Sequence, residues 1–206
     1  MSKGGAAPWP PQPVTLESET VRLEPLAPEH ALALRAAAAD GRLWELWFTS
    51  VPTPEGAPAY VESALLGQSR GTMLPFAVRD RASGEIIGST RYCNIETDRP
   101  RLEIGYTWYA KRFQKSAVNT ECKLLLLSHA FESLGCLAVE FRTNWFNFAS
   151  REAIARLGAK QDGVLRSHML NPDGSLRDTV VFSIIAPEWP GVRKHLQFRL
   201  QRLRGG

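Results

Sequence analysis

The chain has 206 residues, of which 44% are hydrophobic and 22% are charged, and its formal net charge is +4. This length suits one domain with a sizeable core. The modest positive charge suits an anionic ligand but lies far below that of dedicated nucleic-acid-binding proteins. No apolar run is long enough to span a membrane and no secretory leader opens the chain, so we expect a soluble cytoplasmic protein without a membrane partner.

The first 15 residues are rich in Pro, Gly and Ala, which predicts a disordered tail before a single domain over residues 16–206. The domain opens with Thr20–Leu26, an alternating run that we expect to be an edge strand because Pro25 cannot donate to a ladder. The three cysteines have no metal-ligand spacing, so we expect reduced, buried thiols and no metal.

A helix is predicted between Pro28 and Gly41, and a second one over Pro54–Gln68. The segment between them carries Trp44, Trp47 and Phe48. These aromatic side chains either fill the gap between the two helices or line a pocket for a substrate.

Three strands follow with short turns, which predicts an antiparallel meander. They are Met73–Arg79, Glu85–Ile95, in which Gly88 marks a bulge or a close approach, and Leu102–Tyr109. A Leu-rich helix, Asn119–Leu134, then leads to the strand Leu137–Thr143, and a crossover of that length predicts a parallel neighbour. Asn119 or Thr120 can cap this helix and Gly135 can end it.

The last third of the chain predicts a helix over Asn147–Leu157, a hairpin of Ala159–Leu170 with Leu176–Ile185, and a basic helix from Pro187 onward. The basic side of that helix is interpreted as a solvated face; contact with an acidic partner or pairing of two chains as a homodimer stays open. The fold class is therefore α/β, with one mixed sheet and a central crossover helix.

The functional prediction centres on the stretch Trp108–Gly135, in which a strand ends, a basic loop turns and a helix begins. Amides of Lys115–Asn119 and the helix N-terminus converge there, and Lys111, Arg112 and Lys115 add positive charge. Such a loop suits a diphosphate; the alternative is an ordinary strand-to-helix loop with solvated lysines.

With Gln114, Ala117 and Asn119 in the positions of its loop signature, the chain resembles the GNAT superfamily of acetyl-CoA-dependent N-acetyltransferases. The block N-x-x-S-R-x-A-x-x-R-L-G-A and the ending R-D-T-V-V-F-S-I resemble the ribosomal-protein alanine acetyltransferase branch, the RimJ/RimL-like proteins. Asn119 departs from the small residue usual at its position.

The resemblance implies a mostly antiparallel sheet splayed around the crossover helix, with the arm of acetyl-CoA lying in the splay. The residues that it assigns to the cofactor are Trp108, Tyr109, Gln114, Lys115, Ser116, Ala117, Val118, Asn119, Thr120, Asn147 and Ser150. For Asn147, an N-cap role in the following helix is an alternative compatible with cofactor contact.

Acyl transfer to an amine needs a base, a stabilised oxyanion and an acid for the leaving thiolate. Glu103 is the first candidate base and His168 the second, because the hairpin lacks the carboxylate that the resemblance leads us to expect. Ser150 matches the acid position, and a backbone amide near Tyr109 matches the oxyanion donor. Each of the three side chains also has a purely structural interpretation.

We therefore predict direct transfer of an acetyl group from acetyl-CoA to a primary amine, on a protein N-terminus or a small molecule. One alternative is a non-catalytic acyl-CoA-binding module. A basic nucleic-acid-binding protein is less favoured because no recognition motif is present. The acceptor cannot be derived from the sequence.

Overall fold

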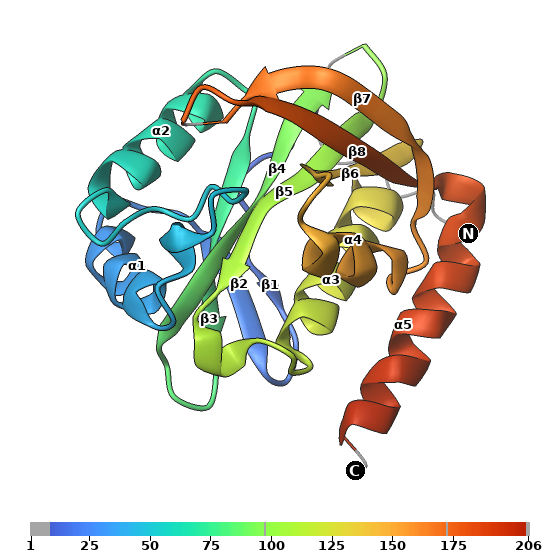
Figure 1. Ribbon diagram of the computed structural model, residues 1–206. Helices are drawn as coiled ribbons and strands as arrows, with labels where there is room; N and C mark the ends of the chain where they lie inside the picture. Colours follow the sequence, from blue (N-terminus) through green and yellow to red (C-terminus); the bar gives the residue numbers. More distant parts are fainter. Residues whose placement is uncertain (1–8, 97, 172, 205–206) are drawn as a thin grey trace.

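The computed structural model describes residues 9–96, 98–171 and 173–204. Within this part of the chain, one eight-stranded sheet has the order β1-β2-β3-β4-β5-β6-β8-β7. The strands are β1 Leu16–Glu17, β2 Val21–Pro25, β3 Leu74–Asp80, β4 Ile86–Glu96, β5 Arg101–Tyr109, β6 Ala138–Asn144, β7 Lys160–Leu170 and β8 Leu176–Ile185. The α-helices are α1 His30–Ala39, α2 Ala57–Ser69, α3 Val118–Ser128, α4 Phe148–Ala155 and α5 Trp189–Arg204. The predicted fold class is confirmed (Figure 1).

Strand pairing follows from the lengths of the connections. Short turns join β3, β4 and β5, which pair antiparallel as predicted. The long crossover through α3 returns the chain so that β6 lies parallel to β5. The last hairpin adds β8 beside β6 and leaves β7 at the edge, so β7 and β8 arch across one end of the molecule in Figure 1.

Helices cover both faces of the sheet and bury two apolar clusters. On one face, Leu126 and Leu127 of α3 and Leu196 of α5 are fully buried against the strands. On the other face, Leu34 of α1 and Val61 of α2 are buried in a second cluster. The sheet is therefore a two-sided wall, and side chains that alternate along a strand enter different environments.

Two features of the N-terminal region differ from the sequence-based expectation. β2 is not an edge strand, because β1 pairs antiparallel with it on its outer side. Residues 9–15 are not a loose tail either: Trp9 packs against the core and its indole Nε1 donates to the carbonyl of Glu96 at 2.8 Å. The apolar surface of the indole explains the docking of a Pro-rich segment. Residues 1–8 lie outside the described residues.

The start of α3 also differs from the expectation. Its N-cap position is Ala117, and Asn119 and Thr120 lie in the first turn. The Ser116 hydroxyl instead accepts from the amide of Val118 at 3.3 Å, so a side chain just before the helix takes part of the capping role. At the other end, a π-helical turn over His129–Ser133 follows α3, and Gly135 has φ +67° as predicted for the residue after a helix.

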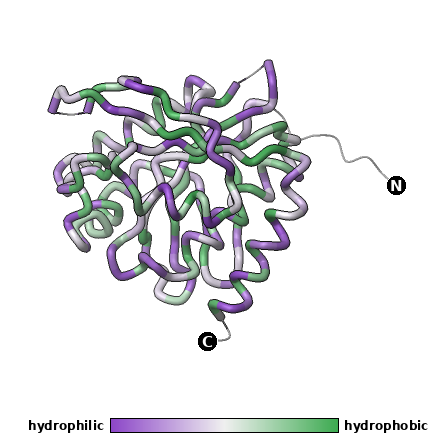
Figure 2. Tube along the Cα trace, turned by 45° about the vertical axis from the view of Figure 1, so that its right-hand side comes forward, coloured by the Kyte–Doolittle hydropathy of each residue, from purple (hydrophilic) through white to green (hydrophobic). Residues whose placement is uncertain are grey.

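The last helix, α5, has two different sides. Val192, Leu196 and Leu200 are buried, whereas Lys194 and Arg202 are exposed. Figure 2 shows the resulting alternation of hydrophobic and hydrophilic residues towards the C-terminus. The interpretation of the basic residues as a solvated face fits this arrangement.

Gly88 marks the predicted close approach between β4 and β5, because a Cβ built on it would lie 2.1 Å from the carbonyl oxygen of Trp108. Gly88→Ala should therefore force the two strands apart and lower the free energy of unfolding by about 3 kcal/mol. Urea unfolding measures this change. Gly163→Ala is the matched control on β7, since nothing lies within 4 Å of its built Cβ; an equal loss in both variants would contradict the steric argument.

Candidate active site

The central feature of the site is the separation of β5 from β6. Their parallel pairing holds at only three positions, Arg101 with Ala138, Leu102 with Val139 and Glu103 with Glu140. Beyond Glu103, β5 continues to Tyr109 and β6 to Asn144 without pairing to each other. The facing backbone groups of both strands are therefore available to an extended ligand between them.

A bulge in β5 accompanies this separation. Ser89 faces Trp108 and Arg91 faces Gly105, so two residues of β5, Tyr106 and Thr107, lie opposite one residue of β4. Tyr106 has φ +52°, a conformation that is rare for a bulky side chain. Bulges bend the strand that carries them, which explains why β5 turns away from β6 here.

A buried lysine lies on the α3 side of this separation. The Nζ atom of Lys123 donates to the hydroxyl of Thr107 at 2.6 Å and lies 6.0 Å from the ring centre of Phe141 on β6. Burial lowers the pKa of Lys123 to about 8. Lys123 was not among the predicted site residues, because a lysine inside a Leu-rich helical run gives no signal of its location.

The loop from β5 to α3 presents unbonded backbone amides next to the N-terminus of the helix. Gln114 Nε2 donates to the carbonyl of Tyr109 at 3.0 Å and so ties the loop to the end of β5. Lys115 adopts φ +58°. In the described chain, the amides of Lys115, Ser116 and Ala117 donate to no backbone oxygen. These free amides, followed at once by the N-terminus of α3, form the geometry of an anion site.

The basic side chains around the loop differ in whether they are free to bind an anion. Lys115 is exposed. Arg112, in contrast, pairs with Asp40 at 3.0 Å and with Glu85 at 2.6 Å. Because these ion pairs hold its guanidinium to the C-terminal end of α1 and to the turn before β4, the expectation that Arg112 adds charge for a diphosphate is not supported.

Several residues predicted to bind the cofactor have buried side chains. Trp108 lies in the cluster under α1 and α2, and Tyr109 lies in the cluster under α3. Val118 and Thr120 are buried in the first turn of α3, while Asn119 is half-buried. A ligand in the separation would meet Trp108 and Tyr109 through their main chain.

Asn147 and Ser150 lie at the N-terminus of α4. The Asn147 side chain caps the helix, because its Oδ1 accepts from the amide of Ser150 at 3.0 Å. This confirms the N-cap interpretation of Asn147. Both residues are half-buried, and the hydroxyl of Ser150 makes no hydrogen bond in the described chain.

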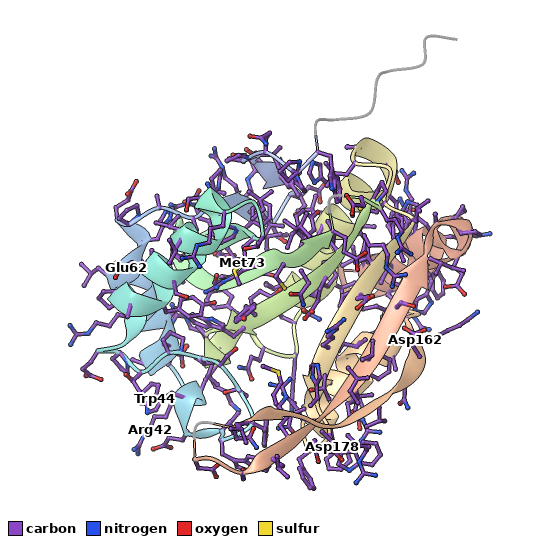
Figure 3. All side chains as sticks on the ribbon, turned by 90° about the horizontal axis from the view of Figure 1, so that it is seen from above. Arg42, Trp44, Glu62, Met73, Asp162 and Asp178 are labelled. Atoms are coloured by element: carbon purple, nitrogen blue, oxygen red, sulfur yellow. The ribbon has the colours of Figure 1, made fainter. Side chains whose placement is uncertain are left out.

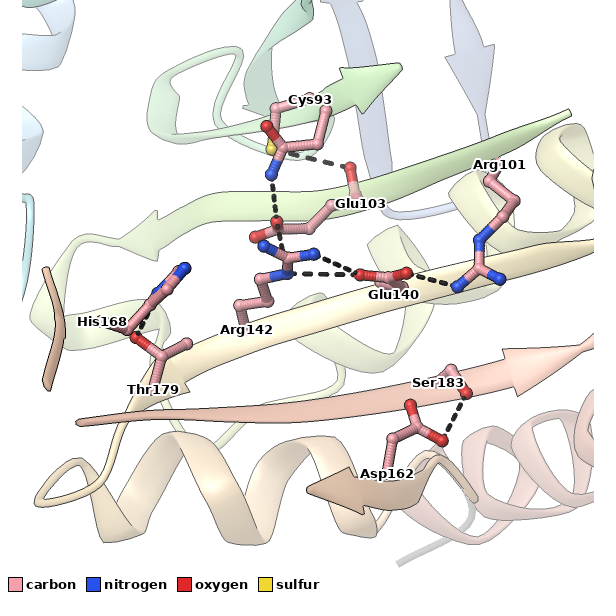
Figure 4. A network of polar contacts seen from close by, with 10 residues as sticks. Cys93, Arg101, Glu103, Glu140, Arg142, Asp162, His168, Thr179 and Ser183 are labelled. Atoms are coloured by element: carbon pink, nitrogen blue, oxygen red, sulfur yellow. Dashed lines mark hydrogen bonds and ion pairs between the residues drawn. The ribbon is translucent and has the colours of Figure 1, made fainter. Parts of the chain in front are cut away.

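Glu103 occupies the position where the β5–β6 pairing ends, and it is 7% exposed. Asn94 Nδ2 donates to its Oε2 at 2.7 Å, and Arg142 Nε lies 3.6 Å from the same oxygen (Figure 4). Burial raises the pKa of Glu103, while the Asn94 hydrogen bond and the nearby Arg142 partly oppose this rise. A buried carboxyl with a raised pKa is suited to accept a proton near neutral pH.

Glu103 belongs to a wider network that the sequence-based prediction missed. Arg142 also binds Glu140, with Nη2 2.9 Å from Oε2, and Glu140 pairs in addition with Arg101. Glu140 and Arg142 alternate along the strand L-A-V-E-F-R-T, so the sequence does show that they share a face. Their proximity to Glu103 follows only from the parallel pairing of β5 with β6.

The structure does not bring His168 to Glu103. His168 lies on the edge strand β7, where it is exposed, and its Nδ1 is 3.2 Å from the hydroxyl of Thr179. Figure 4 shows His168 on the hairpin and Glu103 on β5, with no contact joining them.

The aromatic residues between α1 and α2 form part of a surface cluster. The rings of Trp47 and Phe48 are 5.5 Å apart, and Trp47 also lies 5.6 Å from Phe146, in the loop after β6. Trp44 is half-buried in a 3₁₀ turn, at the position labelled in Figure 3. Trp47 and Phe146 thus connect two loops distant in sequence, and Phe146 was not predicted because only the tertiary structure joins these loops.

An eight-stranded mixed sheet that separates beside a free-amide loop defines an acyl-CoA-dependent transferase fold. Residues 20–160 match the family model described as the acetyltransferase (GNAT) domain. The chain therefore belongs to the GNAT acetyltransferases, a family that uses acetyl-CoA and whose general reaction is the transfer of the acetyl group to an amine.

Individual relatives agree with this assignment. A GCN5-related N-acetyltransferase from Brucella melitensis is 30% identical, with a TM-score of 0.82 over 92% of this chain and 86% of that one. RimJ of Mycobacterium smegmatis, solved with CoA-disulfide, shares the fold at 22% identity, with a TM-score of 0.74 over 93% and 95% of the two chains. The uncharacterized N-acetyltransferase p20 of Bacillus licheniformis is 27% identical over 120 residues, 56% of this chain and 64% of that relative.

The described residues contain no helix with the length and apolar character needed to cross a membrane. The groups at this site fit acetyl-CoA: the free loop amides suit its diphosphate, and the open strand edges suit its extended arm.

Ser116→Asp tests the loop. An Asp side chain can still accept from the amide of Val118, so α3 should start normally, but its charge repels a diphosphate. We expect the affinity for acetyl-CoA to fall by about tenfold or more, measured by titration calorimetry. Ser69→Asp, at the exposed end of α2, should leave the affinity unchanged. Equal affinities in the two variants would mean that the diphosphate binds elsewhere.

Glu103→Gln tests the buried carboxyl through stability. Because the folded-state pKa of Glu103 is raised, its contribution is complete below the unfolded pKa and is lost as pH rises through the folded pKa. Gln cannot ionise, so the variant should gain stability relative to wild type as the pH rises from 4 to 8. Unfolding in urea at both pH values measures the gain. Glu62→Gln, exposed on α2, should show none.

Proposed function

We propose that this protein transfers the acetyl group of acetyl-CoA directly to a primary amine and that Glu103 removes the proton from the acceptor. The observation that carries the proposal is the position of Glu103, a buried carboxyl at the point where β5 and β6 separate. Acetyl-CoA supplies an activated acetyl group, so no covalent intermediate on the enzyme is required.

Glu103 would act as general base, either on the ammonium group itself or through one water molecule. Its raised pKa supports this role, because a base works best when its pKa lies near the working pH. Asn94 and Arg142 would hold the carboxylate in one orientation by their contacts with Oε2. His168 is less favoured as the base, because it is exposed and, among the described residues, its imidazole contacts only the hydroxyl of Thr179.

The remaining roles go to residues on both sides of the separation. A backbone amide near Tyr109 would stabilise the oxyanion, because the bulge at Tyr106 leaves the edge of β5 facing β6 open. Ser150 would donate to the leaving sulfur, since its hydroxyl is not engaged within the described chain. Lys115–Asn119 would bind the diphosphate, and Asn147 would contact the arm through the amide nitrogen that helix capping leaves free.

We further propose that the protein belongs to the RimJ/RimL-like branch and works in the cytoplasm. The Asn147–Ser150 block supports the branch, and three free, buried cysteines support a reducing compartment. Trp44, Trp47 and Phe48 would border the acceptor together with Phe146.

Steady-state kinetics with acetyl-CoA and a panel of primary amines test the proposal. Glu103→Gln should lower kcat by about 10²–10⁴-fold and leave the dissociation constant of acetyl-CoA unchanged, whereas His168→Ala should leave kcat nearly unchanged. A larger loss in His168→Ala would make His168 the base. Binding of acetyl-CoA without thiol release for any amine would favour the non-catalytic alternative.

A further inference from the structure

Arg91 on β4 is a buried cation without an anionic partner. The residue is 2% exposed, and its guanidinium carbon lies 4.3 Å from the ring centre of Tyr60 and 4.4 Å from that of Tyr106. Within the described chain no carboxylate lies within ion-pair distance of it. The two rings stabilise the positive charge through their faces, but they do not accept hydrogen bonds from the N–H groups in the plane of the guanidinium.

The hydrogen bonds of Arg91 are few and weak. Nη2 lies 3.4 Å from the carbonyl of Tyr60, and Nη1 lies 3.6 Å from the sulfur of Met73. Nε is buried and has no partner. A guanidinium carries five donors in a planar fork that matches a carboxylate, so most of its hydrogen-bonding capacity is unused.

Arg177 on β8 is a second arginine with an unused hydrogen-bond donor. It is half-buried, its Nε is buried without a partner, and no carboxylate of the described chain pairs with it. Burial lowers the pKa of Arg177, and the nearby Glu103 and Tyr106 oppose this change. Arg91 contacts the ring of Tyr106 directly from β4. Arg91 and Arg177 therefore both lie near Tyr106, although they belong to different strands.

Other arginines of the same network contrast with this pair. Arg101 and Arg142 both pair with Glu140, and Arg142 also contacts Glu103. Of these four arginines, Arg101 and Arg142 thus have carboxylate partners, whereas Arg91 and Arg177 form no ion pair within the described chain. An interaction with the Tyr60 ring alone would explain the burial of Arg91, but it does not explain Arg177.

Tyr106 covers the guanidinium group of Arg91. Its ring is 40% exposed, and its backbone is held at φ +52° by the bulge. Strained residues of this kind persist where the surrounding structure demands them, often at ligand sites. A ligand that displaces the Tyr106 ring would contact the guanidinium group of Arg91 beneath it.

We propose that Arg91 and Arg177 bind a carboxylate of the acceptor, so that the substrate is a small amine that also carries a carboxylate, with its amino group directed towards Glu103. This rests on the proposed function. The excess of arginine charge disfavours a polyamine, which would bring further positive charge to the same place. It favours an amino acid, whose carboxylate forms paired hydrogen bonds with a guanidinium.

The test compares amino acids with their neutral carboxamides, and with putrescine, as acceptors in thiol-release assays. Wild type should prefer the carboxylate by about tenfold or more in kcat/KM. Arg177→Gln should abolish that preference, and Arg91→Lys should reduce it. Arg166→Gln is the matched control on the same hairpin, because Arg166 is exposed and pairs with Asp178; it should retain the preference.

Product binding gives a second readout that does not need turnover, since a carboxamide also changes the basicity of the neighbouring amine. With CoA bound, N-acetyl amino acids should bind about tenfold more tightly than their carboxamides, and Arg177→Gln should remove the difference. Equal binding of both compounds, or a preference retained in Arg177→Gln, would overturn the proposal. Preferential binding without acetyl transfer to any amine would support the carboxylate site and reject the proposed reaction.

Discussion

The separation of β5 from β6 is the constraint on which the rest of the structure depends. The two strands pair up to Glu103 and Glu140 and then diverge, because Tyr106 and Thr107 form a bulge opposite β4. The same divergence leaves open strand edges, gives Lys123 a polar partner in Thr107, and places the carboxyl of Glu103 at the start of the gap. One irregular pair of residues in β5 thus determines both the open strand edges and the position of Glu103.

The proposed site has two ends with different physical character. The end proposed for the diphosphate consists of main-chain amides and a helix N-terminus, so it tolerates many side chains as long as the loop keeps its path. The end proposed for the acceptor consists of side chains from β4, β5, β6 and β8, where buried charged groups influence one another's pKa. Variation at the second end changes the acceptor without changing the fold, which is why one fold serves many acceptors.

Most of the secondary structure could be predicted from the sequence, and so could the loop. Gly88 was predicted at a close approach of two strands, Gly135 after a helix, and the turn before Leu176 in a hairpin. The structure has each of these features. The errors have local causes. β2 was expected at an edge because Pro25 cannot donate to a ladder, and the two-residue strand β1 that covers this edge gives almost no periodic signal. The cap of α3 was misassigned because Ser116 competes with Asn119 for that role.

The sequence by itself determined the α/β class, the crossover order and the free-amide loop, because these depend on periodicity, turn residues and helix boundaries that are close together along the chain. Only the tertiary structure decided that Arg112 is held by Asp40 and Glu85, that Glu103 shares a network with Arg142, and that the ring of Tyr106 covers Arg91. Those contacts join residues that are far apart along the chain, and the charge and burial of a side chain depend on all of its neighbours in space.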